Sequence, residues 1–280
     1  MTHSWTRGVL ALLLFAASPA TAEGPQRIVS MNLCTDQMAL MLAGPDRIVS
    51  VSFLGADPAE SALADMTEGI SVNHGLAEEI IAAKPDLVLA GRYTTSFAKA
   101  MLRRLGYKVV EVDSPNTIAG IHETFTRVGE AVGEPGRAAA LLAEMDRRLA
   151  VVAAEARGRP RRSAIIYDAN GFTVGRPGLA DDVMTLSGLV NKAPELGIGA
   201  YGQVPLESML AVKPDIIVHL LYRPGVPSIS SMSMQHPALR VMLDGRSPVS
   251  VPGRLFTCGT PLIAEAAESM AKALRQSGAW

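Results

Sequence analysis

Residues 78–89 read EEIIAAKPDLVL, and residues 207–218 read ESMLAVKPDIIV. The two stretches agree in residue type at nearly every position. They lie 129 residues apart, from Lys84 to Lys213. That spacing is far longer than the period of a stacked solenoid repeat and is close to the size of a small domain. The duplication therefore predicts a chain built from two similar lobes.

Each copy predicts a helix, a tight turn and a buried strand. The first half has the apolar spacing of an amphipathic helix, which Lys-Pro then stops, since proline cannot donate the next backbone hydrogen bond. The aspartate opens an uninterrupted apolar run of strand length. A strand that is apolar on both faces is typical of a parallel sheet covered by helices. We therefore expect two α/β lobes with short, mainly parallel sheets.

The rest of the chain supplies further elements on both sides of a helical middle. In the first lobe we expect strands over 27–31, 47–52 and 107–112, and helices over 35–44 and 96–105, the first capped by Thr35. In the second lobe we expect strands over 163–168, 172–174 and 255–258, and helices over 179–186, 239–243 and 261–275. Residues 117–156 read as two helices with a break at 133–136, and the second is long enough to connect the lobes. The expected divisions are 1–22, 23–116 (N-terminal lobe), 117–158 (linking helices) and 159–280 (C-terminal lobe).

Residues 1–22 are typical of a signal peptide. Arg7 supplies the positive start, residues 9–17 the apolar core, and Ala20-Thr21-Ala22 a cleavage site, so we expect cleavage after Ala22. The apolar core is too short to span a bilayer. No cysteine that would carry a lipid follows the site. We therefore expect a soluble, exported protein in the periplasm.

Charge and motifs argue against several function classes. The net charge of −1 gives no electrostatic footprint for nucleic acid. The sequence has no Gly-x-Ser-x-Gly elbow, no Walker loop and no nucleotide fingerprint, so we do not predict an enzyme. A thiol or redox enzyme that uses Cys34 remains as an alternative, although no histidine lies close to Cys34 in the sequence.

Taken together, these features resemble the helical-backbone (class III) periplasmic substrate-binding proteins of ABC importers, which serve iron-siderophore complexes, haem and cobalamin. The resemblance rests on the signal peptide, residues 27–30 (RIVS), the two repeat copies, the single long linking helix and residues 188–191 (GLVN). It extends over essentially the whole mature chain. It implies a monomer with no intrinsic cofactor, which holds a metal chelate in the cleft between two lobes that hardly open.

The resemblance also implies a partner. In this family a glutamate on each lobe, at the start of the helix before Lys-Pro-Asp, docks onto arginines of the permease dimer in the inner membrane. By position these glutamates are Glu78 and Glu207. An acidic residue near a helix N-terminus is favoured by the helix dipole, and exposed charges steer encounter with a cationic partner. Ordinary solvated first-turn glutamates would look the same in the sequence.

Of the two cysteines, Cys34 lies in the loop after the first expected strand, and Cys258 lies at the end of the last one, just before a helix. Loops at the carboxyl ends of strands line the ligand crevice in open α/β sheets, so we expect both cysteines to face the cleft. The periplasm is oxidising, which favours a disulfide between them, and a family that barely opens tolerates a bridge across the cleft. Free thiols in contact with the ligand, or two unrelated buried residues, remain open.

Other candidates for ligand contact also follow strands or lie in glycine-rich loops. Arginine pairs with carboxylates, and arginine and tyrosine both stack on flat rings, so these residues suit a large anionic or aromatic chelate. The candidates are Asn32, His74, Arg92, Tyr93, Tyr167, Arg176, Tyr201, Tyr222 and Arg223.

A site for a bare metal ion is not predicted. A zinc or manganese site needs three or four convergent ligands, whereas the histidines are scattered singly, and His219 is expected in the core. A free metal-ion receptor of the same fold is the other alternative. The sequence does not choose among siderophore, haem and cobalamin.

Overall fold

Both copies of the repeat fold into the same unit. The computed structural model describes residues 24–222, 236–244 and 247–280. In the first copy α2 (Ala77–Ala82) leads to β4 (Leu87–Gly91), and in the second α7 (Leu206–Ala211) leads to β10 (Ile216–Leu221). Lys84 and Lys213, which precede the two prolines, both have positive φ, 48° and 44°. The duplication therefore extends to the backbone conformation of the turn.

The first lobe is built on a five-stranded parallel sheet with strand order β3-β2-β1-β4-β5. Its remaining elements are β1 (Ile28–Ser30), α1 (Leu33–Ala43), β2 (Ile48–Ser52), β3 (Ser71–Asn73), α3 (Ser96–Arg104) and β5 (Val109–Val112).

The second lobe has a four-stranded parallel sheet with strand order β11-β10-β6-β8 and a separate antiparallel pair, β7 and β9. Its remaining elements are β6 (Arg162–Ile166), β7 (Phe172–Val174), α6 (Leu179–Leu186), β8 (Leu189–Asn191), β9 (Tyr201–Gln203), α8 (Pro237–Met242), β11 (Val249–Pro252) and α9 (Ile263–Gln276). The order β2-β1-β4-β5 of the first lobe thus recurs as β8-β6-β10-β11.

The repeated aspartate fastens the first strand of each lobe in the same way. The Asp86 carboxylate accepts the backbone N–H groups of Gln26 and Arg27 at 2.7 and 3.0 Å. In the second lobe the Asp215 carboxylate accepts the backbone N–H and the hydroxyl of Ser163 at 2.8 and 2.7 Å. Each aspartate precedes the repeat strand and thereby fixes β1 beside β4, or β6 beside β10.

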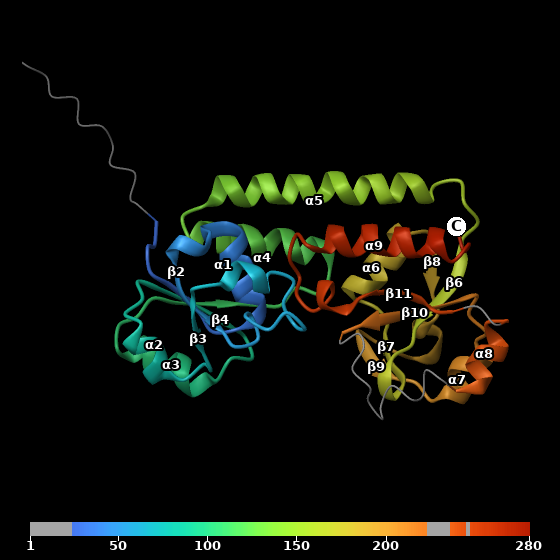
Figure 1. Ribbon diagram of the computed structural model, residues 1–280, viewed down its shortest axis with the longest axis horizontal. Helices are drawn as coiled ribbons and strands as arrows, with labels where there is room; N and C mark the ends of the chain where they lie inside the picture. Colours follow the sequence, from blue (N-terminus) through green and yellow to red (C-terminus); the bar gives the residue numbers. More distant parts are fainter. Residues whose placement is uncertain (1–23, 223–235, 245–246) are drawn as a thin grey trace, which may run out of the picture.

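The apolar runs of the repeat strands are buried on both faces, as the sequence predicts. Along β4, Leu87 and Leu89 belong to the main hydrophobic core, whereas Val88 packs in a smaller cluster with side chains of α2 and α3. Along β10, Ile216 faces the main core and Ile217 a cluster with side chains of α7 and α8. In Figure 1, α2 and α3, and likewise α7 and α8, lie on the side of their sheets away from the linking helix.

Two helices link the lobes, α4 (Ile118–Ala131) and the 22-residue α5 (Pro135–Ala156). Figure 1 shows α5 running along one side of the molecule, over both lobes. A stripe of its side chains enters the main core, which contains residues of both sheets; the stripe comprises Leu142, Met145, Leu149 and Val152. Helix α5 packs on α4 and α9, and the Arg148 guanidinium pairs with Glu268 of α9 through bonds of 2.8 and 2.6 Å. None of the helices in the described ranges is long and apolar enough to cross a membrane.

The structure corrects two details of the expected elements. Helix α1 begins at Leu33, and its N-cap is Asn32, whose side-chain oxygen accepts the Cys34 N–H at 3.0 Å; Thr35 lies inside the helix. The last strand of the second sheet is β11, over Val249–Pro252, and not the segment 255–258. Leu255 and Phe256 are apolar because they are buried in the core, not because they pair in a sheet. The signal-peptide residues lie outside the described ranges.

Candidate ligand site

A disulfide joins the two lobes at the ends of their sheets. Cys34, after β1, is bonded to Cys258, which follows β11 through a short turn, and the two Cα atoms lie 5.1 Å apart. The carboxyl ends of both sheets therefore face each other around this bond. Gly259 approaches Pro115 so closely that a Cβ there would lie 2.4 Å from the proline ring. Ligands of open α/β sheets bind at such carboxyl ends, so we take this inter-lobe face as the candidate site.

The first lobe presents an oriented histidine at this face. The His74 ring stacks on Phe53, with ring centroids 5.6 Å apart. The Glu79 carboxylate accepts the His74 backbone N–H at 2.7 Å and lies 3.0 Å from Nδ1 of the ring. These hydrogen bonds, the backbone one first, hold the pKa of the Glu79 carboxyl below its usual value. The ring is thus fixed through Nδ1, which leaves Nε2 for another partner.

Arg92 and Tyr93 follow β4 directly and are both exposed. The Arg92 guanidinium lies 3.4 Å from the Asp113 carboxylate, and its side chain is 65% exposed. Tyr93 is 88% exposed, although most large apolar side chains of the chain are buried. An exposed arginine beside an exposed phenol can bind a carboxylate and stack on a flat ring.

The second lobe supplies two tyrosines. Tyr201 is exposed and stacks on Phe172, with centroids 6.4 Å apart. Burial, and then electrostatic interactions with Asp168, Tyr201 and Glu60, raise the pKa of Tyr222 to about 12. Glu60 belongs to the first lobe, so the Tyr222 hydroxyl lies within its electrostatic reach across the face. Nearby, Arg254 donates a hydrogen bond of 3.2 Å to the Pro58 carbonyl of the first lobe.

Two further polar groups of the second lobe are tied to buried carboxylates. Arg176 donates from Nε to Asp181 at 2.7 Å, and Asn191 donates to the same carboxylate at 2.9 Å. His219, expected in the core, is partly buried, and its Nε2 lies 2.9 Å from the buried Asp168 carboxylate. The Arg176 side chain remains exposed, whereas the His219 ring is paired with the Asp168 carboxylate.

Two sequence candidates, Tyr167 and Asn32, do not lie free on this face. Tyr167 is only 2% exposed and packs in the cluster of the second lobe with Met209 and Ile217, so the structure places it in the core; burial first, and then Glu207, raise its pKa. Asn32 is engaged as the cap of α1. Arg223 lies outside the described residues.

Sequence reasoning missed a buried carboxyl group close to the disulfide. Asp36, in the first turn of α1, is fully buried and accepts the Ser52 hydroxyl at 2.5 Å. Burial raises the pKa of Asp36 from 3.8 to about 7, and hydrogen bonds from Ser30 and Ser52 limit the rise. Because Ser52 immediately precedes Phe53, Asp36 links α1 to the strand end that carries the stacked pair. Helix α1 is buried on nearly every side, and nothing in the sequence indicated that a carboxylate would be buried with it.

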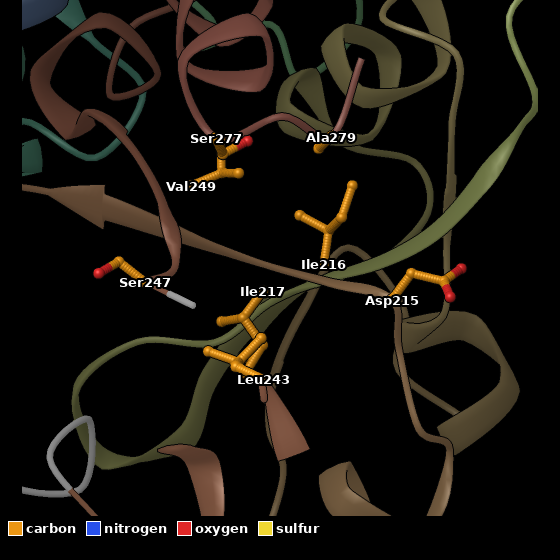
Figure 2. A pocket seen from close by; sticks show the side chains of 8 residues that line it. All are labelled: Asp215, Ile216, Ile217, Leu243, Ser247, Val249, Ser277 and Ala279. Atoms are coloured by element: carbon orange, nitrogen blue, oxygen red, sulfur yellow. The ribbon is translucent and has the colours of Figure 1, made fainter. Parts of the chain in front are cut away.

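A small pocket lies at the opposite end of the second sheet. Figure 2 shows its lining at the start of β10 and β11, with Asp215, Ile216 and Val249 among the contributing residues. The Asp215 carboxylate in this pocket binds Ser163. Since these are the amino ends of the strands, the pocket is separate from the inter-lobe face. Among the described residues no group of three or more histidine, cysteine, aspartate or glutamate side chains is placed to hold a metal ion.

Comparison with known proteins places the chain in a family. A family model described as periplasmic binding protein matches residues 28–221, which is more than half of the chain. The chain belongs to the periplasmic binding protein family.

Two curated relatives of this binding protein also match. A cobalamin-binding protein of Halobacterium salinarum is 26% identical over 199 residues, covering 69% of this chain and 53% of that protein. An uncharacterised ABC transporter substrate-binding lipoprotein of Bacillus subtilis, YvrC, is 24% identical over 203 residues, covering 69% of this chain and 63% of that protein. The chain thus spans about half the length of the first relative and less than two thirds of the second.

Solved structures of similar fold include two proteins of Vibrio cholerae. The periplasmic haem-binding protein HutB superposes with a TM-score of 0.74 at 18% identity, over 89% of this chain and 98% of that one. The vitamin B12-binding protein BtuF superposes with a TM-score of 0.67 at 19% identity, over 92% and 99%. At these identities the likeness shows the fold, two α/β lobes of the helical-backbone class.

The disulfide gives a first prediction for this binding protein. Under non-reducing conditions, proteolysis and mass spectrometry should recover a peptide pair linked through Cys34 and Cys258. The double variant Cys34→Ser/Cys258→Ser should unfold at lower temperature, since a bridge over 224 residues contributes up to about 5 kcal/mol in the chain-entropy model. Reductant should destabilise the native protein and leave the double variant unchanged. Alkylation of both cysteines in unreduced, exported protein would contradict the bridge.

The raised pKa of Asp36 gives a second prediction. Its folded pKa of about 7 exceeds the ordinary 3.8, so the folded state holds the proton more tightly than the unfolded state between these values. The stability that Asp36 contributes is therefore fully present below about pH 4 and is lost as the pH rises through about 7. At about 1.4 kcal/mol per pKa unit the loss is a few kcal/mol. Denaturant unfolding of the native protein and of Asp36→Asn from pH 4 to 8 measures it; a pH-independent difference would show that Asp36 does not titrate in this range.

Proposed function

We propose that this protein is the substrate-binding component of an ABC importer. It is exported to the periplasm, captures a metal chelate (a ferric siderophore or haem) or cobalamin between its lobes, and delivers the ligand to the permease in the inner membrane. Family membership and the fold support the binding role. The names of the relatives, which include cobalamin and haem, support the choice of ligand class.

One observation carries the proposal, the meeting of two sheet ends that both bear exposed rings. The first lobe contributes Phe53, His74 and Tyr93, and the second contributes Tyr201 and Tyr222. Flat conjugated ligands bury a large area against such rings, and aromatic contacts add favourable energy beyond the area buried. Arg92 and Arg176 extend the same face with charges that suit the carboxylates of an anionic chelate. The face is therefore matched in chemistry to a bulky metal chelate.

The two alternatives have less support. A receptor for bare metal ions requires three or four convergent ligands, whereas His74 and the Asp168–His219 pair each bring isolated groups in the described part of the chain. An enzyme that uses the Cys34 thiolate requires a free thiol, but the Cys34 sulfur is bonded to Cys258.

The placement of Glu78 and Glu207 supports docking to a permease dimer. Both side chains are exposed in the first turn of their helices, α2 and α7. In Figure 1 these two helices lie on the side of the lobes away from α5, one in each lobe. A partner with two equivalent basic sites could therefore engage both carboxylates at once, and two simultaneous contacts raise the effective affinity.

A ligand titration tests the proposal. Haemin, cyanocobalamin and ferrichrome are added separately, and binding is followed by tryptophan fluorescence and by the shift in melting temperature. One of the three should bind stoichiometrically and raise the melting temperature, because a ligand that binds only the folded state stabilises it. Phe53→Ala and His74→Ala should each weaken binding about tenfold, whereas Leu105→Ala, at the exposed apolar residue that caps the end of α3, should not. Tight binding of Zn²⁺ or Mn²⁺ alone, with none of the three chelates, would favour the bare-ion receptor.

Charge reversal tests docking. The double variant Glu78→Lys/Glu207→Lys should retain the ligand affinity of the native protein and should fail to stimulate ATP hydrolysis by the reconstituted permease. The control is Glu123→Lys/Glu130→Lys, which changes the net charge equally with two exposed glutamates on α4. If the first variant stimulates like the control, these glutamates do not dock.

A further inference from the structure

Lys99 is a buried cation that none of the preceding roles explains. It lies on α3, and only 5% of the residue is exposed. Its ammonium donates to the Arg92 carbonyl at 2.8 Å and to the Gly91 carbonyl at 3.3 Å, and it lies 3.1 Å from the Glu111 carboxylate. Burial of a charge is costly unless it is paired and hydrogen-bonded. The three partners meet that requirement, and two of them are backbone carbonyls at the end of β4.

The two carbonyls mark the point where β4 becomes the loop of the ligand face. The rest of this turn is also hydrogen-bonded: Thr94 donates its N–H to the Gly91 carbonyl and accepts the Gly91 N–H at its hydroxyl, each at 3.0 Å. The Arg92 N–H is bound by the Val112 carbonyl at 3.0 Å. Lys99 therefore binds the turn from its buried side, whereas the side chains of Arg92 and Tyr93 are exposed.

We propose that Lys99 is a positioning residue for ligand capture: its ammonium fixes the Gly91–Tyr93 loop so that Arg92 and Tyr93 meet the ligand in a preset orientation. The inference rests on the proposed function, because it assigns these two side chains to the ligand. Preorganisation raises affinity by removing the entropy cost of ordering the loop on binding. Lys99 itself is buried and contacts no ligand.

The helix carries its own control. Arg103, one turn further along α3, also lies 3.3 Å from Glu111, yet it is exposed and has no bond to the loop carbonyls. The pKa of Glu111 is lowered first by its hydrogen bond with Lys99 and then by the one with Arg103. Arg103→Met removes one cation from Glu111 and leaves the hydrogen bonds of the loop intact. Lys99→Met also removes one cation from Glu111, but in addition it removes the two hydrogen bonds to the loop carbonyls. The difference between the two variants isolates the loop.

Two measurements on the full-length exported protein test the proposal. Hydrogen exchange of the amides of residues 91–95 should speed up at least tenfold in Lys99→Met and remain native in Arg103→Met. The affinity for whichever of haemin, cyanocobalamin and ferrichrome binds the native protein should fall about tenfold in Lys99→Met and stay native in Arg103→Met. If Lys99→Met fails to fold, Lys99→Gln, which keeps one short donor, takes its place.

A double-mutant cycle separates positioning from general damage to the lobe. In the background Arg92→Ala/Tyr93→Ala, the substitution Lys99→Met should no longer change the affinity, because the side chains that it positions are gone. An undiminished tenfold loss in that background, or native exchange at residues 91–95 in Lys99→Met, would overturn the proposal. If no probe binds the native protein, the proposed function fails. The role of Lys99 is tested separately by hydrogen exchange, and native exchange at residues 91–95 in Lys99→Met would overturn it.

Discussion

The two lobes of this protein are joined covalently at two places, and both links fix the distance between the lobes. The chain passes once between them through α4 and α5, and α5 is packed along its length into a core shared by both sheets. The Cys34–Cys258 bond is a second, covalent link at the sheet ends. A hinge motion between the lobes needs a flexible connection. Here one side of α5 is packed into the core, and the loops beside the ligand face are joined by the disulfide. The inter-lobe face is therefore close to its working geometry before ligand arrives, which lowers the ordering cost of binding.

Duplication explains the frame of the molecule but not its ligand chemistry. The strand order and the aspartate that fastens the first strand recur in both lobes, as do the exposed glutamates of α2 and α7. The loops at the carboxyl ends do not recur: one lobe presents a carboxylate-fixed histidine and an arginine, and the other presents stacked and half-buried tyrosines. This division fits the proposed roles. Docking to the proposed two-fold partner calls for like surfaces on the two lobes, whereas a single asymmetric ligand calls for unlike ones.

The sequence predicted those elements whose cause is local or repeated. The Lys-Pro-Asp units, the long α5 and the approach of the two cysteines follow from proline chemistry, apolar spacing and the rule that strand ends face the crevice. Errors arose where long-range packing decides. Leu255 and Phe256 looked like a strand because burial in a core and pairing in a sheet select the same side chains. Tyr167 follows its strand as expected, yet its ring turns into the core. Asp36 and Lys99 are charged residues inside helices, and their burial depends on partners elsewhere in the chain, Ser52 and Glu111.

The electrostatic surroundings of the polar groups differ between the two lobes and suit them to different contacts with a ligand. Tyr222 is partly exposed and lies near the carboxylates of Asp168 and Glu60; burial of its hydroxyl first, and then these charges, raise its pKa to about 12, so at neutral pH it is a neutral phenol able to donate a hydrogen bond. A phenolate ligand to iron would need the opposite environment, with cations that stabilise the anion. In the first lobe the Glu79 carboxylate lies 3.0 Å from Nδ1 of His74, and a carboxylate against one ring nitrogen is the usual arrangement of a metal-binding histidine. For the proposed metal chelate, direct contact with the metal therefore suits His74 of the first lobe, and hydrogen bonding to the periphery of the chelate suits Tyr222 of the second.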